Sequence, residues 1–159
     1  MKALLSKIRR VGRVAEPAPR RPAEAPMRPE LAGSAQVRCV DAGSCNGCEI
    51  EIGQAFGPLY DADRYGVRLV ASPRHADVLA VTGPVTRNMA TALRRTYNAT
   101  PEPRLVVAVG DCAIDCGEFA GGPGVHGPVD SVVPVDLAVP GCPPTPDAIV
   151  AALRRVTGR

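Results

Sequence analysis

The sequence is poor in aromatic residues and contains no tryptophan. Its 159 residues include three tyrosines, two phenylalanines and two histidines. Recognition of nucleic acid by stacking of bases on aromatic side chains is therefore poorly supported, and we expect no nucleic-acid partner. The two histidines, His75 and His126, are too few and too scattered to suggest a metal site, and we expect both at the surface.

Long apolar runs are also absent. No segment approaches the roughly 20 apolar residues that are needed to span a bilayer. The first residues carry positive charge but lack an apolar core of secretory length, and Arg9-Arg10 stands without the rest of a twin-arginine signal. We therefore expect a cytosolic chain, in which cysteines more often serve metal or redox chemistry than structural disulfides.

Basic charge is concentrated at the N-terminus. The chain has a formal net charge of +3, but residues 1–30 alone carry a balance of +5 and residues 31–159 a balance of −2. The body is thus no obvious binder of polyanions. The length allows one domain with a real core, which we place at residues 31–159.

The N-terminal region should not belong to this core. Five prolines within residues 15–30 predict an extended linker. Residues 1–14 favour either a short amphipathic helix at a membrane surface or a solvated basic tail. The apolar residues that would share one helix face are Leu4, Leu5, Ile8 and Val11.

Short apolar runs alternate with helical patterns in the rest of the chain. The runs that predict strands are Val37–Val40, Val67–Ala71, Asp77–Val81, Leu105–Val109 and Val132–Val139. The predicted helices are Glu49–Phe56, Arg87–Tyr97 and one that Thr145 caps, ending near Val156. The glycine-rich segment Gly117–Gly127 predicts a loop. This alternation implies an α/β fold with three layers and a largely parallel sheet.

Cysteines follow three of the predicted strands in glycine-containing turns. Cys45 and Cys48 follow the first strand, Cys112 follows Leu105–Val109, and Cys142 follows the last strand. The carboxyl ends of parallel strands share one edge of a sheet, where open α/β sheets bind ligands. The four thiols can therefore converge on one point.

Four thiols in one place are compatible with three kinds of site. An iron–sulfur cluster needs four thiolates and benefits from small neighbours whose backbone N–H groups can point at sulfur, as the glycines of these turns allow. A structural zinc ion usually takes two close pairs, which Cys112 and Cys116 could complete while leaving Cys142 unexplained. A thiol–disulfide protein would use Cys45 and Cys48 alone.

Three motifs in a fixed order carry a family resemblance. They are Asp41-Ala42-Gly43-Ser44-Cys45-Asn46-Gly47-Cys48-Glu49, then Gly110-Asp111-Cys112-Ala113, then Pro140-Gly141-Cys142-Pro143-Pro144. This set resembles the small-subunit family of [NiFe] hydrogenases, which includes the B subunit of respiratory NADH:quinone oxidoreductase. The spacing of two residues between Cys45 and Cys48 resembles that of the energy-converting, membrane-associated hydrogenases of the formate hydrogenlyase type. The respiratory subunit instead has adjacent cysteines there.

The resemblance implies a flavodoxin-like fold that holds one [4Fe–4S] cluster on Cys45, Cys48, Cys112 and Cys142. It also implies a non-catalytic electron-relay subunit of an oxidoreductase complex, peripheral on the cytoplasmic side of the cell membrane. The implied partners are a [NiFe]-hydrogenase-like large subunit, a ferredoxin-like iron–sulfur subunit and membrane subunits. The remaining alternatives are the thiol–disulfide protein and a zinc-stabilised interaction module.

Four other features near the motifs allow two interpretations each. Glu49 directly follows the second cysteine and is a candidate for proton transfer, or a plain acid at a helix start. Cys116 and Cys39 are expected to pack as small residues and not to be ligands. The segment Thr82–Val85 is similar to a family loop near the cluster, or is simply a turn.

Overall fold

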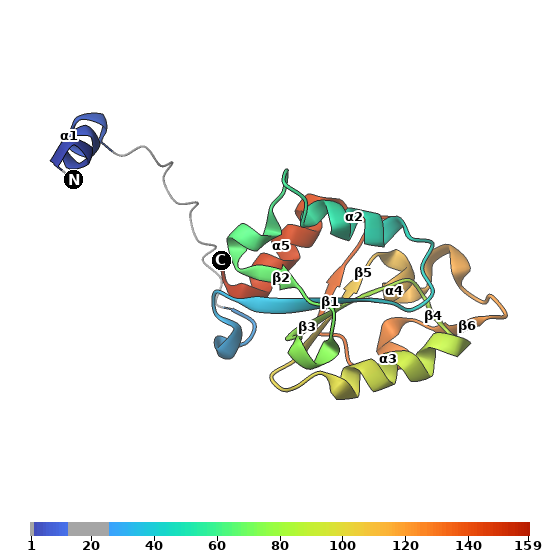
Figure 1. Ribbon diagram of the computed structural model, residues 1–159. Helices are drawn as coiled ribbons and strands as arrows, with labels where there is room; N and C mark the ends of the chain where they lie inside the picture. The colour runs from blue at the N-terminus through green and yellow to red at the C-terminus, as the bar shows by residue number, and fades with distance from the viewer. Residues whose placement is uncertain (1, 13–25) are drawn as a thin grey trace.

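The body of the molecule is built on a parallel sheet. The computed structural model describes residues 2–12 and 26–159 (Figure 1). Five strands form the sheet: β1 (Ala35–Asp41), β2 (Val67–Leu69), β3 (Val78–Thr82), β5 (Leu105–Val109) and β7 (Leu137–Val139). Their order is β2-β1-β3-β5-β7, and every pair is parallel. This is the flavodoxin-like order, so the predicted fold class is confirmed.

Helices cover both faces of the sheet (Figure 1). The residues of α2 (Gly47–Ala55) and α5 (Pro146–Thr157) share one buried cluster, while α3 (Arg87–Ala99) and α4 (Asp111–Asp115) contribute to another. Successive residues of the central strands alternate between the two clusters, as the period of a β-strand requires. The predicted three layers are therefore present.

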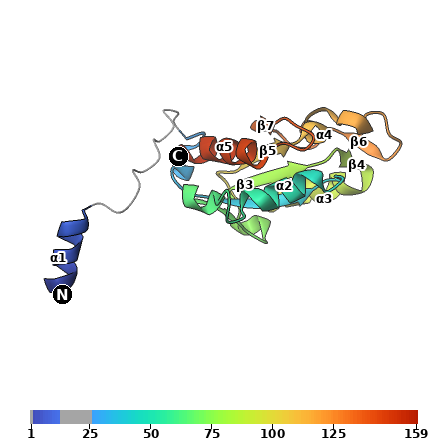
Figure 2. The same ribbon diagram turned by 90° about the horizontal axis from the view of Figure 1, so that it is seen from above.

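The two ends of the body differ in what they carry. Figures 1 and 2 both show α4 and the short strands β4 (Val85–Thr86) and β6 (Val125–Gly127) at one end, and the C-terminus at the other. The carboxyl ends of the sheet strands point toward the first end, since α4 directly follows β5. The turns that follow the strands therefore gather there.

Two helix starts show how the sequence sets these boundaries. Thr145 caps α5, because its hydroxyl accepts a hydrogen bond from the Ala148 backbone N–H at 3.3 Å and Pro146 occupies the first turn. This start was predicted. The helix α2 instead begins at Gly47, before the predicted Glu49, so Cys48 lies in its first turn.

Two segments differ from the prediction. The segment predicted as a loop, Gly117–Gly127, contains β6, which pairs antiparallel with β4. Within Val132–Val139 only β7 is a strand, because Pro134 has no backbone N–H to join a ladder. Pairing starts at Asp136, whose carboxylate and backbone N–H both bond the backbone of Val106, at 2.8 and 2.9 Å.

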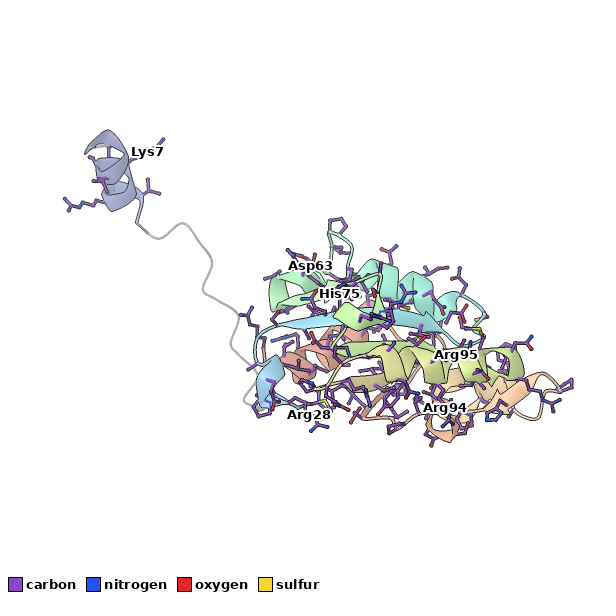
Figure 3. All side chains as sticks on the ribbon, turned by 60° about the horizontal axis from the view of Figure 1, so that its bottom comes forward. Lys7, Arg28, Asp63, His75, Arg94 and Arg95 are labelled. Carbon is purple, nitrogen blue, oxygen red and sulfur yellow. The ribbon has the colours of Figure 1, made fainter. Side chains whose placement is uncertain are left out.

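Short 3-10 turns connect several elements of the described chain. They are Pro29–Leu31, Ala62–Tyr65, Pro73–His75, Gly117–Phe119 and Val129–Ser131. His75 lies on one of them, exposed at the surface of the body (Figure 3), and His126 in β6 is exposed as well. The predicted surface positions of both histidines are confirmed.

The N-terminal region is described in two pieces. Residues 2–11 form α1 (Lys2–Val11), in which Leu5 and Val11 are 53% and 57% exposed. Most of the predicted linker lies outside the described residues, but Met27 packs against the core cluster under α2 and α5. None of the helices in the described ranges has the length and apolar content that crossing a bilayer requires.

Candidate functional site

The first cysteine turn is shaped by the last residue of β1. The Asp41 carboxylate accepts hydrogen bonds from the backbone N–H groups of Gly43 and Ser44, at 2.7 and 2.8 Å. Such a bond pattern stabilises a tight turn locally. It places Cys45 in the turn, exposed, and Cys48 in the first turn of α2, buried.

The second and third cysteine turns are fastened to each other. The Asp111 carboxylate accepts a hydrogen bond from the Gly141 N–H at 2.7 Å, and the Asp111 N–H donates to the Gly141 carbonyl at 2.9 Å. Cys112 and Cys142 are the next residues along the chain. Two turns that lie 30 residues apart in the sequence are thus held in a fixed relation.

All four predicted ligands line one cavity, whose volume is about 140 Å³. The lining residues come from the turns after β1, β3, β5 and β7, and are Ser44, Cys45, Gly47, Cys48, Gly83, Cys112, Cys142 and Pro143. The topology predicted this meeting of thiols at the carboxyl edge. Within residues 2–12 and 26–159, no three His, Cys, Asp or Glu side chains stand close enough together to hold a single metal ion.

The ionised thiols in this cavity would repel one another. Burial, followed by the negative charges of Glu49 and of the other three thiolates, raises the pKa of Cys48 to about 12. The pKa of Cys112 is also raised, mainly by burial and then by the charges of Cys142 and Cys45. Four thiolates can therefore coexist here only beside a positively charged centre such as bound metal. The four thiols fit an iron–sulfur cluster, which they would hold and which would supply this positive charge.

The two other cysteines lie outside the cavity lining. Cys39, inside β1, is half-buried and packs against the core, and burial raises its pKa to about 11. Cys116 follows α4 with a left-handed backbone at φ 71° and is 5% exposed. Both positions agree with the expectation that these residues pack as small side chains.

Glycine at position 110 leaves room for the sulfur of Cys48. Its backbone has φ +93°, and a Cβ atom there would lie 2.5 Å from the Cys48 Sγ, closer than real Cβ atoms approach other atoms. The absence of a side chain at Gly110 is therefore a requirement of the cysteine arrangement. Gly53, in the middle of α2, has open space around it.

Gly110→Ala is expected to lower iron content severalfold and to destabilise the fold by about 1–3 kcal/mol, because the sulfur must move and the backbone becomes strained. Gly53→Ala is the matched control, expected to keep iron and to gain about 0.5–1 kcal/mol of helix stability. Iron analysis and thermal unfolding measure both effects. Equal iron content in the two variants would show that Gly110 does not govern the ligand geometry.

The hydrogen bonds of Glu49 were not predicted from the sequence. The Glu49 carboxylate accepts hydrogen bonds from the hydroxyls of Ser44 and Thr82. Thr82 ends β3, which pairs with β1, and this pairing brings the two turns together. Only the strand order could have revealed the contact. The predicted role of Glu49 in proton transfer stays a prediction.

The comparison with protein families decides the classification. Residues 45–156 match the family described as NADH ubiquinone oxidoreductase, 20 kDa subunit. The chain belongs to this family. The match begins at Cys45 and includes all four cysteines of the cavity. The resemblance to [NiFe] hydrogenase small subunits and to the B subunit of NADH:quinone oxidoreductase is thereby confirmed.

The relatives include a probable membrane-bound hydrogenase subunit and a formate hydrogenlyase subunit. The probable membrane-bound hydrogenase subunit mbhJ of Pyrococcus furiosus is 51% identical over 111 residues, which are 70% of this chain and 66% of that protein. Formate hydrogenlyase subunit 7 of Escherichia coli K12 is 43% identical over 135 residues, 85% of this chain and 53% of that protein. The chain therefore spans about two thirds and about half of their lengths.

Solved structures agree with this placement. A chain of the membrane-bound sulfane sulfur reductase, an archaeal respiratory membrane complex, superimposes with a TM-score of 0.70 and 29% identity, covering 80% of this chain and 71% of that one. A chain of the NAD+-reducing [NiFe]-hydrogenase gives 0.58 at 23% identity, covering 73% and 86%. The second likeness supports the fold alone.

Proposed function

We propose that this family member is an electron-relay subunit that holds one [4Fe–4S] cluster on Cys45, Cys48, Cys112 and Cys142. The observation that carries the proposal is that thiols from three separate turns line one cavity at the carboxyl edge of the sheet. When bound, such a cluster accepts and returns one electron at a time. The chain's own residues supply the four thiolates and the glycines that let the turns approach.

The cavity favours this cofactor over the two alternatives. A single zinc ion draws its sulfur ligands to about 2.3 Å, whereas these four thiols surround about 140 Å³ of space. A thiol–disulfide protein would need only Cys45 and Cys48, yet Cys112 and Cys142 line the same cavity. A cluster of several iron atoms uses all four thiols and fills the space between them.

The relatives support the proposed partners. Relatives are subunits of a membrane-bound hydrogenase and of formate hydrogenlyase. We therefore place this chain between a [NiFe]-hydrogenase-like large subunit, where the chemistry on hydrogen or quinone would occur, and a ferredoxin-like subunit. It would sit peripherally, with membrane subunits of the complex, on the cytoplasmic side of the membrane.

A reductive titration of the anaerobically purified chain tests the relay. We expect a reversible reduction by one electron per chain, followed by optical absorbance and a paramagnetic signal of the reduced state. Zinc in the site would give no reducible centre. A Cys45–Cys48 disulfide would take up two electrons and two protons per chain to give two thiols, without a paramagnetic signal. Either result would refute the relay.

The basic N-terminal region would add to membrane association. The helix α1 has Arg9 and Arg10 in its last turn and no acidic residue in its first turn. Each basic residue near an anionic surface contributes about 1 kcal/mol. Removing residues 1–25 should weaken binding to anionic vesicles by an order of magnitude or more and leave iron content unchanged. Added salt should mimic the loss, and neutral vesicles serve as the control. Equal binding by both forms at every salt concentration would remove this role.

A further inference from the structure

Both oxygens of the Glu49 carboxylate are held by hydroxyl groups. The Ser44 Oγ donates to Oε2 at 2.5 Å, and the Thr82 Oγ1 donates to Oε1. The Ser44 hydroxyl also accepts the Asn46 N–H at 2.9 Å, so its single proton is directed to the carboxylate. The carboxylate is therefore fixed from two elements, the first cysteine turn and the end of β3.

The surroundings of Thr82 keep this arrangement rigid. Thr82 is fully buried, and its strand is paired with β1 on one side and β5 on the other. At the next residue, Gly83, a Cβ would lie 2.5 Å from the Ser44 Cα, so the glycine permits the close approach of the two turns. The strand thus holds the Thr82 side chain in place, and the Glu49 carboxylate that accepts its hydrogen bond has little freedom to move.

The held carboxylate lies next to the cysteine cavity. Glu49 directly follows Cys48, and Ser44 and Gly83 line the cavity together with the four thiols. The two hydroxyl groups therefore hold the carboxylate on the residue next to a proposed cluster ligand, beside the part of the cavity wall that Ser44 and Gly83 form.

We infer that Ser44 and Thr82 are positioning residues that hold the Glu49 carboxylate beside Cys48 as a fixed negative charge, which lowers the reduction potential of the cluster. The inference rests on the proposed function. Nearby charge is one of the factors that set cluster potentials. An electron added to the cluster would be repelled by this nearby negative charge, so the reduced state would be disfavoured.

The test compares midpoint potentials of the full chain, reconstituted anaerobically with iron and sulfide, after iron content has been measured. Glu49→Gln should raise the potential most. Thr82→Val, which keeps the shape of the side chain but loses the hydroxyl, and Ser44→Ala should each raise it by part of that shift. Thr82→Ser retains the hydroxyl and should keep the wild-type midpoint potential.

Glu51→Gln is the control for charge alone. It removes the same charge from the same helix, at a side chain that accepts no hydrogen bond from Ser44 or Thr82. Its potential should stay closer to wild type than that of Glu49→Gln.

The outcomes separate this inference from the proposed function. A wild-type chain without iron would overturn the proposed function. Iron-loaded Glu49→Gln at the wild-type potential, or equal shifts for Glu49→Gln and Glu51→Gln, would overturn the inference. A shift in Glu49→Gln with none in Thr82→Val and Ser44→Ala would remove the positioning role. If Thr82→Val fails to fold, Ser44→Ala and Thr82→Ser decide the same question.

Discussion

Replacing any one of Cys45, Cys48, Cys112 and Cys142 with serine is expected to remove nearly all iron from the protein. Changes to the mere hydrogen-bonding partners of metal ligands already cost about 10–100-fold in metal affinity, and loss of a ligand should cost more. All four thiols line the same cavity, so each variant leaves the cluster one ligand short. Iron content and the paramagnetic signal of the reduced state measure the loss.

Cys39→Ser and Cys116→Ser are the matched controls. They make the same chemical change at thiols that do not line the cavity. Both variants should keep their iron, although the buried Cys116 position makes a modest loss of stability expected for its variant. A Cys116 variant without iron beside a Cys112 variant that retains it would reassign the third ligand.

The second large effect is the loss of the cluster on exposure to air. Cys45 and Cys142 line the cavity and are both exposed, so a cluster bound there would meet water and oxygen in the isolated chain. We expect the isolated chain to lose its cluster absorbance in air and to show no hydrogenase activity. A large subunit that closes over this edge should slow the loss by an order of magnitude or more and shift the reduction potential, because it excludes solvent.

The experiment exposes the chain to air with and without that partner and follows absorbance. A subunit that binds elsewhere on the complex is the control, because it should give no protection. Equal decay of the isolated chain and of its complex with the large subunit would place the cluster away from the interface, and the proposed relay would lose this support.

Much of this fold can be predicted from the sequence. Continuous apolar runs rich in valine, such as Leu105–Val109, are buried on both faces, so they identify central parallel strands. The proline after Thr145 marks the start of α5 with equal clarity. In each case the residues that indicate the element belong to it or lie next to it, and their conformational preference agrees with the final structure.

The missed features depend on contacts between distant residues. The short pairing of β4 with β6 involves only a few residues from a glycine-rich segment, and no local pattern indicates it. The same holds in the site. The cysteines stand out by residue type, whereas the hydrogen bond between Thr82 and Glu49 joins residues 33 positions apart and depends on the strand order.

The most direct test of the central claim is the content of iron and acid-labile sulfide in the full chain, purified and handled without oxygen. The account predicts about four of each per chain, the composition of one [4Fe–4S] cluster, and their joint loss on replacing Cys142 with serine. Zinc without sulfide, or a metal-free protein with a titratable Cys45–Cys48 pair, would contradict it.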